Sequence, residues 1–123
     1  MVDISKLSDL RVLVVEDEGL VMMLIQDYLE ELGCHVVATA MRINDALIQA
    51  RSASINMALL DVNLAGTLSY PVATILAERS IPFIFATGYG SLAVPDAMQS
   101  VPVLPKPFLM EQLAKVLEQA RST

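Results

Sequence analysis

Three carboxylates stand where buried strands are expected to end. Asp61 closes the apolar run Met57–Leu60, and Glu16 and Asp17 follow the run Arg11–Val15. A strand covered by helices on both faces reads as a continuous apolar run. Open α/β sheets bind their ligands at the carboxyl ends of such strands. A carboxylate held there suits a nucleophile or a metal ligand. For Asp61 considered alone, the alternative is an Asp that merely caps a turn.

A hydroxyl and a cation follow two later apolar runs. Thr87 comes directly after Pro82–Ala86, and Gly88 beside it would let an anion approach the backbone. Lys106 lies between two prolines, and a cis Lys106–Pro107 bond would aim its ammonium group into the same crevice. A carboxylate nucleophile with a hydroxyl donor and a cation around it is the set that phosphoryl transfer requires.

The elements that must position these residues alternate along the chain. Strands are expected over 11–15, 35–39, 56–61, 82–86 and 101–104, and helices over 20–32, 43–51, 72–79 and 108–121. The segment 91–99 is a poor helix because Pro95 lies in its middle. This alternation predicts an α/β fold, a flavodoxin-like (βα)5 doubly wound parallel sheet with strand order 2-1-3-4-5. The length of 123 residues predicts a single domain over residues 1–123.

Two helix ends carry more specific expectations. Gly33 is placed to end the first helix in a left-handed conformation. Pro71 is tolerated in the first turn of the third helix. The last helix is expected to bury one stripe of apolar residues, namely Leu109, Leu113, Val116 and Ala120.

The predicted strand order makes the first and third strands neighbours. Glu16, Asp17 and Asp61 then share one crevice, and a hard divalent cation is a favourable way to hold three carboxylates together. Mg²⁺ fits, because it takes few carboxylates and keeps waters that a phosphate can displace. The backbone carbonyl of Asn63 is placed to add a ligand. The alternative is an acidic turn that binds no ion.

Composition restricts the partners. The chain has 8 Lys and Arg residues against 14 Asp and Glu residues, a net charge of −6, so the basic surface needed for nucleic acid is absent. No apolar run reaches the length of a membrane helix, and the N-terminus does not resemble a signal peptide. Cys34 is the only cysteine, which fits a reducing cytoplasm.

At these residues the chain resembles the receiver domain of bacterial two-component response regulators over its whole length. Glu16 and Asp17 match the acidic pair of that family, Asp61 the phosphorylated aspartate and Thr87 the switch hydroxyl. Residues 106–108 match the Lys-Pro-Phe motif of the family. The resemblance implies a phosphohistidine donor, carried by a histidine kinase or a histidine phosphotransferase, and kinases commonly dock on the first helix of receivers.

The segment Pro82–Gly90 resembles the signature of the receiver subgroup nicknamed FAT GUY, which often occurs as stand-alone domains. Typical receivers carry Tyr or Phe three residues before the lysine, and here that position is Val103. An aromatic rotor therefore cannot operate at this position. Tyr89 is the nearest aromatic that could replace it as a switch residue, and an exposed loop aromatic is the alternative.

The resulting expectation is a single-domain response regulator rather than an enzyme. Phosphorylation of Asp61 would change binding of a downstream protein target through Thr87, Lys106 and the face between the fourth strand and fifth helix. A phosphate sink in a phosphorelay is an alternative, because no effector domain is expected after the last helix. A Mg²⁺-dependent small-molecule phosphatase would need an Asp two residues after its nucleophile, where Asn63 stands. A partner-binding pseudo-receiver would lack the Asp or the Lys.

Overall fold

The computed structural model describes residues 7–88 and 94–121. Within them, strands and helices alternate as the sequence predicts, with one additional hairpin. The elements in chain order are β1 (Arg11–Val15), α1 (Gly19–Glu31), β2 (His35–Ala40), α2 (Ile43–Ser52), β3 (Met57–Asp61), β4 (Asn63–Leu64), β5 (Thr67–Leu68), α3 (Tyr70–Glu78), β6 (Phe83–Thr87), the 3₁₀ helix η3 (Asp96–Met98), β7 (Val103–Pro105) and α4 (Met110–Arg121).

The main sheet has five parallel strands in the order β2-β1-β3-β6-β7. With the small hairpin β4-β5 set aside, this is the predicted order 2-1-3-4-5, so the flavodoxin-like α/β fold is confirmed. Val15 of β1 pairs with Leu60 of β3, and Asp61 pairs with Ala86 of β6. This register brings the carboxyl ends of β1, β3 and β6 together at one edge.

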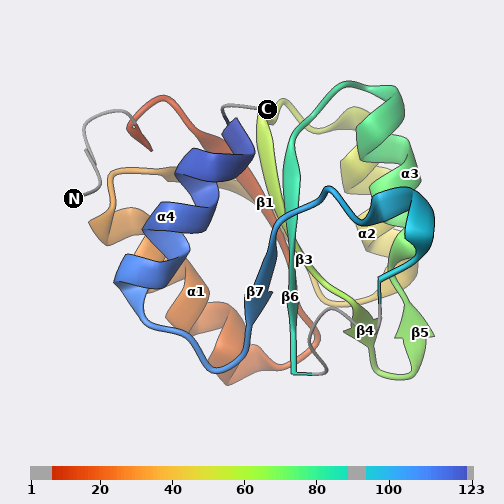
Figure 1. Cartoon of the computed structure of the whole chain (residues 1–123), viewed down its shortest axis with the longest axis horizontal. Coiled ribbons are helices and arrows are strands. Elements are labelled where there is room, and N and C mark those ends of the chain that lie inside the picture. The colour runs from red at the N-terminus through yellow and green to blue at the C-terminus, as the bar shows by residue number, and fades with distance from the viewer. Residues whose placement is uncertain (1–6, 89–93, 122–123) are drawn as a thin grey trace.

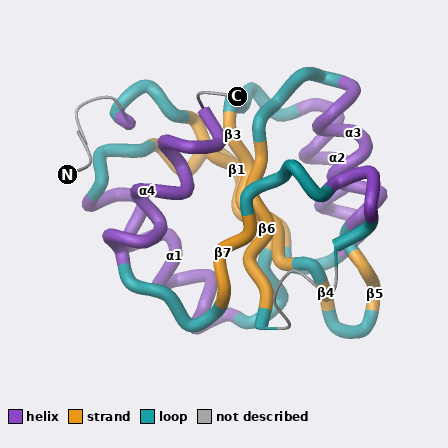
Figure 2. Tube along the Cα trace, in the orientation of Figure 1, coloured by secondary structure: helices purple, strands orange, loops and turns teal. Residues whose placement is uncertain are grey.

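Helices cover both faces of the sheet. Figure 1 shows α1 and α4 on one face and α2 and α3 on the other, and Figure 2 shows the strands as one layer between them. The buried side chains form two clusters, one on each face. All five residues of β3 are buried, which explains its unbroken apolar run. Burial of each large aliphatic side chain contributes about 1.5–3 kcal/mol.

The helix ends agree with the sequence at two points and differ at one. Gly33 has φ 86°, and the N–H of Cys34 donates to the carbonyl of Leu29, so the predicted left-handed cap is confirmed. Pro71 lies in the first turn of α3, as predicted. The expectation that Leu109 is buried was wrong, because α4 begins only at Met110 and Leu109 is 68% exposed.

The segment between β6 and β7 contains little regular structure in its described part. Residues 94–99 include only the 3₁₀ helix η3, and residues 91–93 of the predicted poor helix lie outside the described residues. Pro95 directly precedes η3, where its fixed backbone angle is tolerated. None of the helices over 7–88 and 94–121 is long and apolar enough to cross a membrane.

The hairpin β4-β5 was not predicted. Its two-residue turn is formed by Ala65 with φ 51° and Gly66 with φ 94°. Two positive φ angles are typical of the tight turn that joins twisted antiparallel strands. Asn-Gly or Asp-Gly would have been a recognisable signal for this turn, whereas Ala-Gly is a weak one.

Candidate functional site

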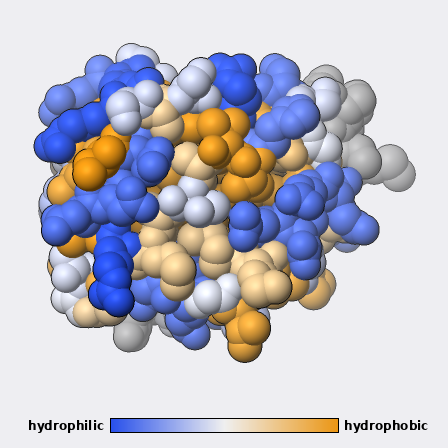
Figure 3. All heavy atoms as spheres, turned by 180° about the vertical axis from the view of Figure 1, so that it is seen from behind, coloured by the Kyte–Doolittle hydropathy of each residue, from blue (hydrophilic) through white to orange (hydrophobic). Residues whose placement is uncertain are grey.

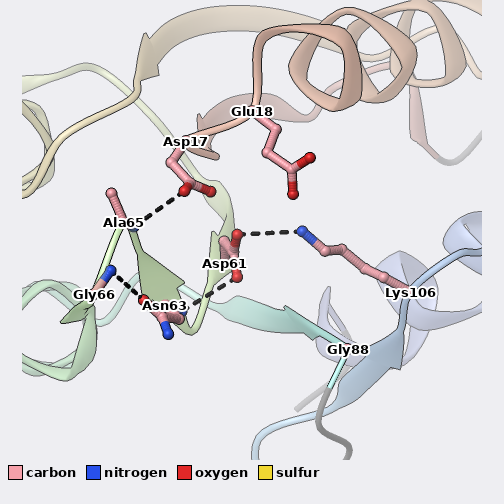
Figure 4. A pocket seen from close by; sticks show the side chains of 8 residues that line it. All are labelled: Asp17, Glu18, Asp61, Asn63, Ala65, Gly66, Gly88 and Lys106. Atoms are coloured by element: carbon pink, nitrogen blue, oxygen red, sulfur yellow. Dashed lines mark hydrogen bonds and ion pairs between the residues drawn. The ribbon is translucent and has the colours of Figure 1, made fainter.

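A pocket of about 460 Å³ lies at the carboxyl ends of the central strands (Figure 4). It receives residues from segments that follow β1, β3, β6 and β7. The lining residues are Asp17, Glu18, Asp61, Asn63, Ala65, Gly66, Gly88 and Lys106. The fold therefore gathers at one place four segments that are far apart in the sequence.

Lys106 connects two carboxylates at this pocket. Its Nζ lies 2.6 Å from Oε1 of Glu16 and 3.2 Å from Oδ2 of Asp61. The Lys106–Pro107 bond is cis, in agreement with the expectation from the flanking prolines. The backbone N–H of Lys106 donates to the carbonyl of Thr87 at 2.9 Å, which continues the pairing of β7 with β6. Burial would lower the pKa of Lys106, but its bonds to Glu16 and Asp61 raise it, so the ammonium stays charged.

Asp61 is held through both of its carboxylate oxygens and through its main-chain carbonyl. While Oδ2 contacts Lys106, Oδ1 accepts a hydrogen bond from the N–H of Asn63 at 3.2 Å. The main-chain carbonyl of Asp61 accepts a bond from the Ser69 hydroxyl at 2.6 Å. The residue is only 7% exposed, yet its carboxylate lines the pocket. Asp61 is thus a fixed oxygen group that a ligand can reach.

Glu16 lies behind the pocket rather than in its lining. It is 1% exposed, and its Oε2 accepts a hydrogen bond from the N–H of Glu18 at 3.4 Å. Burial raises the pKa of Glu16 to about 7, and contact with the Asp61 carboxyl adds to this, while Lys106 acts in the opposite direction. Of the predicted metal ligands, Asp17, Asp61 and Asn63 line the pocket, and Glu16 supports it from behind.

The hairpin β4-β5 forms a wall of the pocket. The N–H of Ala65 donates to Oδ2 of Asp17 at 3.0 Å, and the N–H of Gly66 donates to Oδ1 of Asn63 at 2.7 Å. Partial burial would raise the pKa of Asp17, but contacts with the neighbouring carboxyls and the bond from Ala65 lower it. Asp17 is therefore held as a charged group beside the pocket.

The donor chemistry suits a hard cation. Glu16, Asp17 and Glu18 each offer a carboxylate oxygen, and these atoms lie within 4.8 Å of one another. Carboxylate oxygens with room for water are what Mg²⁺ prefers. Glu18, which Figure 4 shows pointing toward Asp61, was not among the predicted site residues. Its place as a third consecutive acidic residue was the available signal.

The residues considered for the switch differ in where they lie. Thr87 ends β6 and is 1% exposed, and Gly88 lines the pocket as expected. Val103 is half-buried and packs against the core on the α2–α3 face. Tyr89 lies outside the described residues.

The comparisons with known proteins identify the class. The profile of the response regulator receiver domain matches residues 12–118, so the chain belongs to this family. The matched region begins within β1, contains β2 to β7 and extends into α4. A comparison with curated protein sequences gave no match.

Several solved structures are similar. The solution structure of SdrG from Sphingomonas melonis Fr1 has 41% identity and TM-score 0.82, and the alignment covers 94% of this chain and 98% of SdrG. The BeF3-activated conformation of SdrG from Pseudomonas melonis Fr1 has 41% identity and TM-score 0.78, covering 94% and 97%. The anti-anti-sigma factor PhyR from Bartonella quintana has 28% identity and TM-score 0.79, covering 96% of this chain and 49% of PhyR.

Proposed function

We propose that the chain is a single-domain response regulator that accepts a phosphoryl group on Asp61 from a phosphohistidine. The observation that carries the proposal is the Asp61 carboxylate, fixed by Lys106 and the Asn63 N–H yet open to a pocket. In the transfer, a carboxylate oxygen of Asp61 bonds to phosphorus. The bond from phosphorus to the donor's imidazole nitrogen breaks, and its electron pair stays on that nitrogen.

The charges around Asp61 suit this transfer. The Lys106 ammonium faces the equatorial oxygens, and the Thr87 hydroxyl with the backbone at Gly88 supplies further donors. We propose that Asp17, Asp61 and the backbone carbonyl of Asn63 would hold Mg²⁺, with Glu16 behind them. When bound, Mg²⁺ neutralises charge on the phosphoryl oxygens. The contacts of Asp61 with Lys106 and with the Asn63 N–H fix its carboxylate for attack on phosphorus. Lys106 also remains paired with Glu16.

We propose that the phosphohistidine partner, a histidine kinase or histidine phosphotransferase, docks on α1. Three apolar side chains of this helix are exposed, with Leu20 at 84%, Met23 at 60% and Leu24 at 46%. A groove of about 250 Å³ beside them includes Pro107 and Phe108 and shares Glu18 and Lys106 with the pocket. A partner seated there would present its imidazole at Asp61.

The output of this receiver is the binding of a downstream protein. Phosphorylation adds a charge of about −1.5 to −2, which Thr87 and Lys106 respond to by repacking the face between β6 and α4. The resemblance of residues 82–90 to the FAT GUY signature and the similarity to SdrG support a stand-alone receiver in the cytoplasm. If the chain acted only as a phosphate sink, a pull-down would recover no protein that binds the phosphorylated form more strongly than the unphosphorylated form.

The test is phosphorylation by a small phosphodonor with Mg²⁺. We expect one acid-labile phosphoryl group on the natural chain and none on Asp61→Asn, with Asp27→Asn, an exposed residue of α1, as the matched control. Label that persists in Asp61→Asn would assign the acceptor elsewhere. Sustained phosphate release would instead indicate a phosphatase, which the amide at Asn63 disfavours because it cannot exchange a proton.

A further inference from the structure

Tyr70, the first residue of α3, buries its hydroxyl without a hydrogen-bond partner among the described residues. Its ring meets Phe85 edge-on, with centroids 5.8 Å apart at 88°. Over the described residues 7–88 and 94–121, its oxygen is the buried side-chain polar atom without a hydrogen-bond partner. Burial raises the pKa of Tyr70, so the phenol stays protonated and remains a donor. A buried donor left unpaired is unfavourable, and such a group in a native structure needs an explanation.

The position of this ring relates it to the switch threonine. Phe85 and Thr87 are two residues apart on β6, so their side chains lie on the same face of the sheet. Phe85 also pairs in register with Val103 of β7. Tyr70 and Val103 both pack against the cluster on the α2–α3 face. The Tyr70 ring therefore lies beside β6, the strand that ends at Thr87, although position 103 carries no aromatic residue.

A short connection joins Tyr70 to the phosphorylation site. Ser69 is fully buried, and its hydroxyl donates to the main-chain carbonyl of Asp61 at 2.6 Å. The Ser69 N–H donates to the carbonyl of Val62 at 2.9 Å. Both hydrogen bonds end on residues that would move when Asp61 gains a phosphoryl group. The residue directly after this anchor is Tyr70, so displacement at Asp61 reaches its ring through one peptide unit.

We propose that Tyr70 is the aromatic switch residue of this receiver, with Ser69 as the positioning residue that couples it to Asp61. The inference rests on the proposed function, because it names the group that responds when Asp61 is phosphorylated. In the resting form the Tyr70 hydroxyl has no hydrogen-bond partner among residues 7–88 and 94–121. In the phosphorylated form it gains one as the start of α3 shifts against β6. A bond made in one state only favours that state over the other.

The experiment uses the full chain with BeF3⁻ and Mg²⁺ as the probe of the activated state. Tyrosine labelled with ¹³C at Cζ reports hydrogen bonding of the phenol, and Tyr28 of α1, which packs on Phe108, is an internal control. We expect the Tyr70 Cζ resonance to shift when BeF3⁻ is added, while the Tyr28 resonance stays in place. In Ser69→Ala, the Tyr70 shift should be lost although the Asn63 amide, bonded to Asp61, still responds.

Tyr70→Phe supplies a second measurement that does not depend on the label. It should fold at least as well as the natural chain, because the hydroxyl that it removes has no partner within the part of the chain that the structure describes. Amide shift changes over residues 94–104 should fall to about half of the natural pattern or less, since the activated population drops. Tyr28→Phe is the matched control and should retain the full pattern.

The possible outcomes separate the two proposals. An Asn63 amide that ignores BeF3⁻ in the natural chain overturns the proposed function and this role of Tyr70 with it. If Asn63 responds but Tyr70→Phe keeps the full pattern over residues 94–104, Tyr70 is not the switch residue. An unmoved Tyr70 Cζ resonance beside a responding Asn63 amide leads to the same conclusion.

Discussion

Replacing Glu16 with Gln should change how the stability of the metal-free protein depends on pH. The pKa of Glu16 is raised from 4.5 to about 7 because the group is buried beside Asp61. The folded protein then holds this proton more tightly than the unfolded chain. The favourable contribution is complete below about pH 4.5 and is lost as the pH rises through about 7.

The structure sets the size of this effect. At about 1.4 kcal/mol for each unit of pKa, the shift corresponds to about 3 kcal/mol of unfolding free energy. The conversion is justified because Glu16 is only 1% exposed. Lys106 does not titrate in this range, since its pKa is raised.

Urea denaturation with a chelator present, at several values between about pH 5 and about pH 8, would measure the effect. The free energy of unfolding of the natural chain should fall by about 3 kcal/mol more than that of Glu16→Gln across this range. Adding Mg²⁺ at the upper end should recover part of the loss, because a cation favours the ionised carboxyls. Parallel profiles for the two proteins would refute the argument that Glu16 is protonated near neutrality.

Four further substitutions test other parts of the site and of the proposed switch. Asp17→Asn should weaken Mg²⁺ binding in a calorimetric titration without unfolding the metal-free domain, and an unchanged affinity would remove Asp17 from the ligands. Lys106→Met should cost about 3–5 kcal/mol in urea denaturation at about pH 8 and less at low pH, where buried Glu16 takes a proton; a pH-independent cost would contradict this pairing. Tyr89→Ala should leave phosphorylation intact and, because Tyr70 is proposed as the switch residue, retain the amide shift changes over residues 94–104; a blunted pattern would assign the switch to Tyr89 instead. Val103→Ala should only lower the free energy of unfolding, by about 1–3 kcal/mol of lost packing.

The parts of the fold that depend on buried periodic runs were predictable. β3 is apolar from Met57 to Leu60 and ends in Asp61, so this run indicates both the buried strand and the carboxylate at its end. Lys106 was recognised because two prolines restrict the backbone around it. These signals are local, and the parallel sheet that joins them follows from the alternation of strands and helices.

Other features depend on contacts that a sequence does not display. The hairpin turn at Ala65 and Gly66 lacks the usual Asn or Asp and is stabilised by its bond to Asp17. Leu109 fits the helical stripe, yet the N-terminal end of α4 lies one residue beyond it. The location of Glu16 behind the pocket follows from its bond to Lys106, ninety residues away in the chain.

The central sheet also keeps the two layers of the core apart. The exposed apolar residues of α1 lie on the layer shared with α4, whereas Tyr70, Phe85 and Val103 belong to the α2–α3 layer. Figure 3 shows the reverse side of the molecule, where an apolar band runs between hydrophilic flanks. Changes in separate, non-contacting layers combine additively. Substitutions at the exposed apolar residues of α1 should therefore leave the packing around Tyr70 and Phe85 unchanged, so a chimera that exchanges only this surface should change its phosphodonor without altering the α2–α3 layer.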